Sequence, residues 1–259
     1  MQFSVIMPAL NEEDNIEKAV SNAFTAFSDL DLTGEVIVIN DGSTDRTAQI
    51  VESLKSRYPE IRMLSHSTPQ GIGASFWEAV DAAKGDAVVL LPGDNENDPW
   101  EIFRYARLLQ HVDIVIPFLF DKNTRSLFRN GLSFLYRFII NSTFLVYFNY
   151  TNGTVIYRTS ILRKLGFRSE GFFFQTHILI RLVKQGYLFA EVPYRINHRQ
   201  SGVSKAVSFP SLLQVIKGYL RLAKDYHFDN KIKTDGSDFT KDSQSLERHS
   251  HDHNKKFQK

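Results

Sequence analysis

Short apolar runs alternate with longer amphipathic segments through the first half of the chain. The runs predict strands at residues 4–7, 35–39, 61–64, 86–91 and 113–117. Helical segments begin near residues 11 and 45 and at residue 76, the first rich in acidic residues at its start and the last ended by Gly85. Strands joined by helices of this length form a mostly parallel, doubly wound sheet, so the pattern predicts an α/β fold.

The chain next becomes rich in aromatic and aliphatic residues, from position 125 to position 150. Apolar side chains recur there at helical spacing: Phe128, Leu132, Leu135 and Ile139. Residues 138–157 are uncharged and long enough to span a membrane, but polar residues interrupt them, so we reject a spanning helix. Arginines 125, 129 and 137 beside this apolar face fit a helix that lies in a membrane interface. A core helix with a solvent-facing edge fits equally well.

A second amphipathic helix is predicted at residues 211–228. Its basic row fits an anionic surface or plain solvent: Lys217, Arg221 and Lys224. From residue 229 the chain is polar and charged, with few apolar residues, which predicts a disordered tail over residues 229–259. We therefore assign residues 1–228 to one domain with C-terminal amphipathic helices.

Composition narrows the class of protein. Lys and Arg number 31 against 29 Asp and Glu, so the net charge of +2 gives no strong field toward nucleic acid. The chain has no cysteine, which excludes disulfides and thiolate metal sites and fits a reducing compartment. Its first residues lack a basic segment followed by a long apolar one, so we expect no signal peptide and a cytoplasmic protein.

Polar clusters follow three of the predicted strands, at residues 8–12, 40–43 and 94–96. The carboxyl ends of parallel strands share one edge of a doubly wound sheet, so these clusters converge on one crevice. There Asp41 can accept a hydrogen bond from a nucleobase N–H. Asp94 and Glu96 supply the oxygen ligands that Mg²⁺ or Mn²⁺ uses. No G-x-G-x-x-G follows the first strand, which argues against a dinucleotide-dependent dehydrogenase.

Several short motifs occur in a characteristic order. They are VIMPALNEE at 5–13, VINDGSTDRT at 38–47, GIGA at 71–74 and the stretch from Gly85 to Asp94. Together they resemble the family 2 glycosyltransferases. Residues 152–158, 186–193 and 199–205 resemble the polyprenyl-phosphate (dolichyl-phosphate mannose synthase-like) branch of that family. The resemblance implies a GT-A fold, a nucleotide-diphosphate-sugar donor, a divalent metal and inversion at the anomeric carbon.

The same resemblance implies roles for individual residues. It places these residues around the nucleoside, the last of them against the base: Pro8, Ala9, Glu12 and Asp41. Asp94 matches the last Asp of the family's Asp-x-Asp metal motif, and Glu96 stands where a further ligand lies. Arg199 and Lys205 match the Arg-x-x-Gly-x-Ser-Lys element that closes over the donor phosphates.

Two positions depart from the family's pattern. Pro92 occupies the first Asp position of the metal motif, and Asn40 replaces the first of the usual Asp pair before Gly-Ser. Mg²⁺ keeps several waters and needs only one or two protein carboxylates besides the substrate phosphates. Asp94 and Glu96 therefore suffice for a metal site on chemical grounds.

The acceptor side lacks an expected general base. Many relatives present a carboxylate in the segment that is residues 174–179 here, and this chain has none there. A sugar hydroxyl needs a base, whereas a lipid phosphate is already anionic and needs only cations to position it. Arg125 and Arg129, one helical turn apart, suit that task. His177 is the alternative, as a base for a soluble acceptor.

We therefore predict a metal-dependent, inverting transfer of a hexose from a nucleotide-diphosphate sugar to a polyprenyl phosphate. The protein is expected to act at the cytoplasmic face of a membrane, bound to its surface or to a membrane partner. Two alternatives stay open. One is a glycosyltransferase for a soluble or saccharide acceptor. The other is a nucleotide-sugar-binding protein that Pro92 has deprived of catalysis.

Overall fold

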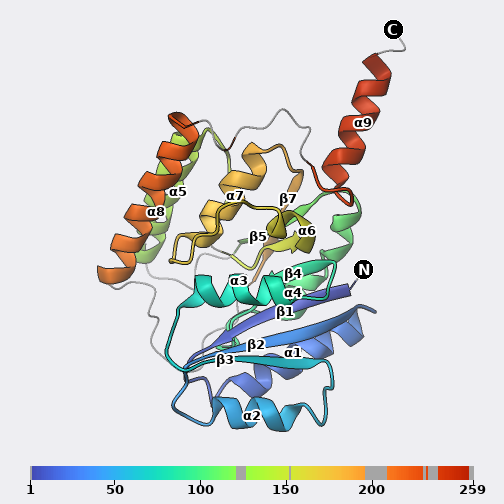
Figure 1. Ribbon diagram of the computed structural model, residues 1–259, viewed down its shortest axis with the longest axis vertical. Helices are drawn as coiled ribbons and strands as arrows, with labels where there is room; N and C mark the ends of the chain where they lie inside the picture. The colour runs from blue at the N-terminus through green and yellow to red at the C-terminus, as the bar shows by residue number, and fades with distance from the viewer. Residues whose placement is uncertain are drawn as a thin grey trace.

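The computed structural model describes residues 2–120, 127–151, 153–195, 209–229, 232 and 239–256, without the side chains of 127–129, 209–211 and 251–256. The strands are β1 (Gln2–Ala9), β2 (Thr33–Asp41), β3 (Ile61–His66), β4 (Ala87–Leu90), β5 (Ile114–Leu119), β6 (Ile156–Arg158) and β7 (Phe189–Tyr194). The helices are α1 (Ile16–Asp29), α2 (Thr47–Leu54), α3 (Ile72–Ala82), α4 (Pro99–Phe103), the 3₁₀ helix η1 (Ala106–Gln110), α5 (Leu127–Phe144), α6 (Thr159–Arg163), α7 (Phe174–Lys184), α8 (Phe209–His227) and α9 (Gln244–Lys256). Figure 1 shows their arrangement.

The described strands form one sheet in the order β3-β2-β1-β4-β6-β5-β7. Neighbours pair in parallel except β6, which is antiparallel to both β4 and β5. The predicted doubly wound, mostly parallel sheet is therefore confirmed. Strands β6 and β7 come in addition to the five that the apolar runs predict.

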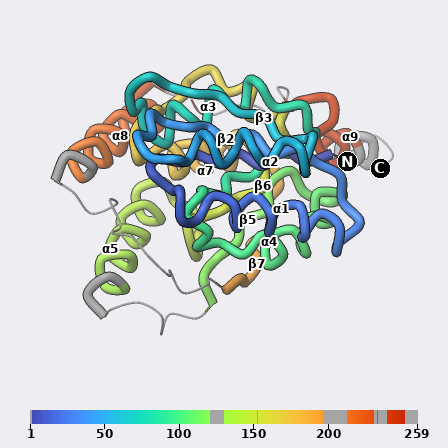
Figure 2. The backbone as a smooth tube through the Cα atoms, turned by 90° about the horizontal axis from the view of Figure 1, so that it is seen from below, coloured from blue at the N-terminus to red at the C-terminus, as the bar shows by residue number. Residues whose placement is uncertain are grey.

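Apolar side chains cover both faces of the central strands. In β1, Val5 and Met7 belong to the core on the α1 side, while Ile6 belongs to the core on the α3 side. Figure 2 shows α1 and α3 on opposite sides of the sheet. Burial on both faces explains why these strands are continuous apolar runs in the sequence and do not alternate with polar residues.

The two predicted amphipathic helices are α5 and α8, and the C-terminal end of α5 packs against the C-terminal half of α8. The hydroxyl groups of Thr143 and Tyr219 lie 2.8 Å apart, and the ring of Tyr219 meets that of Phe144 edge-on. Phe144 and Ile140 are buried, so this side of α5 faces the core. The apolar stripe predicted from the sequence faces away from it, because its described members are exposed: Leu132, Leu135 and Ile139. Among the described helices, none combines the length and apolar character needed to cross a membrane.

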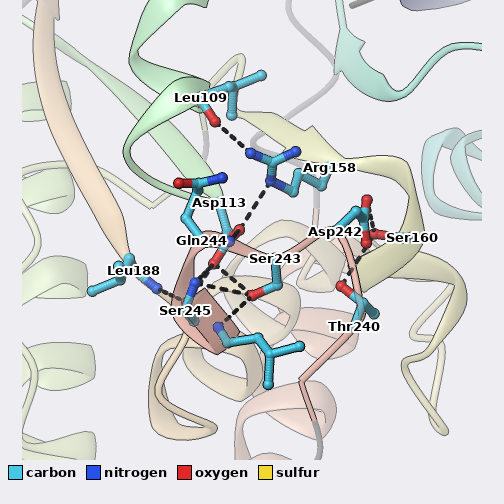
Figure 3. A network of polar contacts seen from close by, with 11 residues as sticks. Leu109, Asp113, Arg158, Ser160, Leu188, Thr240, Asp242, Ser243, Gln244 and Ser245 are labelled. Carbon is cyan, nitrogen blue, oxygen red and sulfur yellow. Dashed lines mark hydrogen bonds and ion pairs between the residues drawn. The ribbon is translucent and has the colours of Figure 1, made fainter. Parts of the chain in front are cut away.

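The polar segment after residue 229 contains structure at residues 239–256. Asp113, just before β5, is fully buried and accepts a hydrogen bond from Nε of Arg158 at 2.9 Å. It also accepts hydrogen bonds from the backbone N–H groups of Gln244 and Ser245, at 2.8 and 3.1 Å, and from the Ser243 hydroxyl at 3.1 Å (Figure 3). These contacts fix the N-terminus of α9, so this part of the predicted tail is anchored to the sheet.

Candidate active site

The backbone beyond β4 brings Asp94 to the end of β1. Two hydrogen bonds extend the strand pairing, from Leu91 N to Ile6 O at 2.9 Å and from Gly93 N to Pro8 O at 3.0 Å. A Cβ atom on Gly93 would lie 2.8 Å from Cδ1 of Ile16 and 3.2 Å from Cβ of Ala9, so a larger residue at this close approach would force its neighbours to shift. Pro8, Ala9 and the Asp94 turn therefore meet, as the sequence predicts.

Hydrogen bonds join the loop after β1 to the loop after β2. The Asn11 N–H donates to the Ser43 hydroxyl at 3.0 Å, and the Asn11 side-chain oxygen accepts from Thr44 N at 2.8 Å. The Glu12 N–H donates to the Thr47 hydroxyl at 2.9 Å. Because these contacts link both loops, the two walls of the predicted nucleoside pocket form one unit.

The carboxylate of Glu12 makes a hydrogen bond within the loop that follows β1. Its Oε2 accepts a hydrogen bond from the side-chain amide of Asn15 at 2.9 Å.

Asp45 lies on the opposite loop, after β2. Burial acts to raise the pKa of Asp45, but hydrogen bonds from the Thr47 hydroxyl and N–H outweigh it and lower that pKa. Asp45 is therefore an anion that holds the start of α2.

Asp41, the last residue of β2, is 6% exposed. Its Oδ1 accepts from the N–H of Gln70 at 2.7 Å and lies 2.6 Å from Nδ1 of His66, while Oδ2 accepts from the N–H of Gly71 at 2.9 Å. Burial acts to raise the pKa of Asp41. These hydrogen bonds outweigh it, so the pKa is lowered. The predicted base-reading residue is thus ionised and also holds the loop between β3 and α3.

Asp94 and Glu96 lie in one tight turn and are partly exposed. Oδ1 of Asp94 accepts from the N–H of Glu96 at 3.1 Å, and Asn95 between them has a positive φ of 56°. No set of three or more Asp, Glu, His or Cys residues suited to a metal occurs among the described residues. Its two carboxylates are chemically suited to Mg²⁺, which takes one or two carboxylates from the protein and its other oxygens from water and substrate.

The remaining predicted site residues fall partly or wholly outside the described residues. Arg125, Arg199 and Lys205 are not among them. Arg129 lies in the first turns of α5, but its side chain is not described. The structure therefore tests none of the four predicted phosphate contacts, which stay predictions.

His177 is unsuited to act as a general base. Its side chain is buried, and its Nε2 accepts from Nε of Arg181 at 3.1 Å. Burial, followed by the positive charges of Arg181 and Arg221, lowers the pKa of His177 to about 3. The ring is therefore neutral and enclosed in the core, which removes the base that a soluble acceptor was expected to use.

Sequence reasoning missed His66 and the backbone of residues 70–71. His66 is the last residue of β3 and pairs with Asp41 across the sheet register. A sequence signal for His66 exists, because it follows the apolar run 61–64 at the same edge of the sheet as the polar clusters at 8–12, 40–43 and 94–96.

Comparison with known proteins identifies the family. The family model for glycosyl transferase family 2 matches residues 4–166. The chain belongs to this family. A dolichol-phosphate mannosyltransferase of Pyrococcus furiosus is 30% identical over 99 residues, 38% of this chain and 27% of that protein. A dolichyl-phosphate beta-glucosyltransferase of Trichomonas vaginalis is 33% identical over 96 residues, 35% of this chain and 29% of that protein. The matched part of this family 2 chain thus spans less than a third of either relative.

Solved structures share the fold. Glucosyl-3-phosphoglycerate synthase of Mycobacterium tuberculosis, crystallised with Mn²⁺, uridine diphosphate and phosphoglyceric acid, superimposes with a TM-score of 0.66. The two sequences are 23% identical, and the match covers 86% of this chain and 78% of that one. The same enzyme has also been crystallised with Mg²⁺ and uridine diphosphate. The predicted GT-A fold is therefore confirmed for this family 2 glycosyltransferase.

Proposed function

We propose that this glycosyltransferase moves a hexose, with inversion, from a nucleotide-diphosphate sugar to a polyprenyl phosphate. The observation that carries the proposal is the convergence of Asp41, Pro8 and the Asp94 turn at the carboxyl ends of β2, β1 and β4. In an open α/β sheet this edge is where ligands bind. The loops after β1 and β2 are linked by hydrogen bonds before any donor binds, so a nucleoside that binds there would have to order them less.

In this proposal, the turn that contains Asp94 and Glu96 activates the sugar donor. Asp94 and Glu96 would hold Mg²⁺ or Mn²⁺, which when bound offsets the negative charge that builds on the departing diphosphate. Arg199 and Lys205, which lie beyond the described residues, would add cationic hydrogen bonds to the same phosphates. The mycobacterial structures with Mn²⁺ or Mg²⁺ and uridine diphosphate support this use of a metal in the fold.

A phosphate acceptor removes the need for a base. An oxygen of the acceptor phosphate attacks the anomeric carbon, the bond from that carbon to the diphosphate oxygen breaks, and the nucleoside diphosphate departs with the electron pair. No proton has to move, which agrees with the enclosed, neutral His177 and the absence of a carboxylate in residues 174–179. Arg125 and Arg129 would orient the anionic acceptor.

The apolar surface of α5 and α8 supports a lipid acceptor at a membrane surface. Large hydrophobic side chains on α5 are strongly exposed, with Phe134 at 61% and Phe138 at 59%. On α8, Leu220 is exposed to 59%, and Leu212, Leu213 and Ile216 are exposed as well. An apolar surface of this kind on two adjacent helices marks an interaction site more often than plain solvent exposure. We infer that this surface lies against the cytoplasmic face of a membrane.

A single assay tests the acceptor. The protein is incubated with Mn²⁺, a panel of nucleotide sugars and either a short polyprenyl phosphate, phosphoglyceric acid or free sugars. Glycolipid formation in the first arm is the expected result. Transfer only to phosphoglyceric acid or to free sugars would contradict the lipid acceptor, although the protein would still be an active glycosyltransferase. Donor binding without turnover in every arm would support the binding-protein alternative.

A further inference from the structure

Asp41 has little hydrogen-bonding capacity left for a nucleobase. An ionised carboxylate offers about two acceptor positions on each oxygen. Both positions of Oδ1 are filled, one by the N–H of Gln70 at 2.7 Å and one by Nδ1 of His66 at 2.6 Å. Oδ2 accepts from Gly71 N at 2.9 Å. With respect to the described residues, the carboxylate therefore keeps one acceptor position, on Oδ2.

The contact from His66 is fixed by a second carboxylate. Nε2 of His66 lies 2.6 Å from Oε2 of Glu78 on α3, while Nδ1 faces Asp41. An ionised carboxylate accepts and does not donate, so each ring nitrogen carries a proton and His66 is a cation. Burial acts to lower the pKa of His66, but the bonds to Asp41 and Glu78 outweigh it and raise that pKa. Oδ1 of Asp41 is therefore held by a charged donor.

The other two donors are also built into the fold. Residues 68–69 lie against Gly42, where an added Cβ would be 2.9 Å from Cδ of Pro69 and 3.0 Å from the carbonyl carbon of Thr68. Gly42 has a φ of +76°, a conformation that favours glycine. The loop that carries the N–H groups of Gln70 and Gly71 thus packs directly against Gly42, the residue after Asp41.

We propose that His66 is a positioning residue that limits Asp41 to one hydrogen bond from the base, and that the donor therefore carries uracil and not guanine. Guanine presents N1–H and N2–H side by side, a pair that fits both oxygens of one carboxylate. With Oδ1 filled, one of these donors is left unpaired in a nearly buried site, which is unfavourable. Uracil presents a single N3–H, which matches the one position left. The inference rests on the proposed function, because it concerns the same donor site.

Nucleotide affinity tests this selection directly. Uridine diphosphate and guanosine diphosphate are each titrated into the protein with Mn²⁺, and binding is measured by calorimetry and by thermal shift. We expect the uridine nucleotide to bind about tenfold more tightly, the effect of roughly one hydrogen bond to a charged group. Equal or tighter binding of the guanosine nucleotide overturns the selection and leaves the proposed function standing. Failure of both nucleotides to bind overturns the proposed function, and this inference with it.

Variants separate the role of His66 from a merely structural one. His66→Phe keeps a ring but removes the donor to Asp41, so the preference for uridine over guanosine should fall to about one. Glu78→Gln leaves Nδ1 on Asp41 and should keep the wild-type preference. His66→Gln, whose amide can still donate, should lie between them and serves if His66→Phe does not fold. A loss of affinity that is equal for both nucleotides in the His66 variants would assign His66 to stability alone.

Discussion

Removal of residues 240–259 tests whether the C-terminal segment stabilises the catalytic fold. The truncated chain keeps Phe239, whose ring meets that of Tyr187 at 5.1 Å, and loses the segment that binds Asp113. Asp113 is fully buried and accepts from two backbone N–H groups and two serine hydroxyls of that segment. Arg158 remains as a partner in the truncated chain.

The size of the effect follows from the charge of Asp113. A hydrogen bond to a charged group contributes about 1.5–3 kcal/mol, and depriving a buried charge of a partner costs about 3–5 kcal/mol. Water that enters the vacated space replaces part of the loss, so we expect about 3 kcal/mol of destabilisation. For a chain of this size that corresponds to a fall in Tm of about 6–12 °C.

Thermal and urea unfolding measure this effect, and two serine variants locate it. Ser245→Ala removes a donor to Asp113 and the acceptor of Leu188 N, which is 2.8 Å away, and should destabilise by about 1.5–3 kcal/mol. Ser250→Ala is the matched control on the same helix, because its hydroxyl is exposed and donates to Leu246 O within the helix; its effect should stay within about 0.5 kcal/mol. A truncated protein with the wild-type Tm would refute the anchoring and support the prediction of a disordered tail.

Four further results are expected. Gly93→Ala should destabilise by about 1–3 kcal/mol and weaken nucleotide binding, since its Cβ would lie 2.8 Å from Ile16; unchanged melting and affinity would contradict the close approach. Glu96→Gln should lower metal-dependent turnover on the order of a hundredfold, and full activity at limiting Mn²⁺ would remove Glu96 from the metal site. His66 contributes stability that is present below its unfolded pKa and lost as the pH rises through its raised folded pKa, so the stability difference between wild type and His66→Gln should be larger at about pH 6 than at about pH 9 by urea unfolding. Phe134→Ser with Phe138→Ser should abolish sedimentation with anionic vesicles without lowering Tm, whereas unchanged sedimentation would disconnect this surface from the membrane.

The sequence predicts which residues end the strands at the proposed donor site, because the signals for them are local. Asp41 and Asp94 each follow an apolar run, and parallel strands necessarily bring such ends to one edge. The contacts that tune Asp41 are harder to predict. His66 and Gln70 lie 25 and 29 residues from it, and their effect depends on hydrogen-bond geometry that spacing does not reveal.

The tail was harder to predict for a related reason. Residues 240–256 are polar, and composition alone describes such a segment as disordered. Their order depends on Asp113, which is 130 residues from Ser243 and whose burial is invisible in the sequence. A polar segment that satisfies a buried charge gains stability from that contact, and the hydrophobicity of the segment does not reveal it.

The outward-facing stripe of α5 links the fold to the choice of acceptor. Amphipathic spacing in the sequence fits a core helix and an interface helix equally, and burial separates the two. Ile140 and Phe144 bind α5 to the core, whereas Phe134, Leu135 and Phe138 remain uncovered by the described chain. A helix that needed only core packing would not require a second apolar side, because polar residues there would be more soluble. The exposed side is therefore best explained by an apolar partner. Under the proposed function, a polyprenyl chain in a membrane surface would be that partner. Arg129→Ala tests the proposal: acceptor use should fall more than donor binding, and an equal loss of both would contradict the lipid-phosphate role.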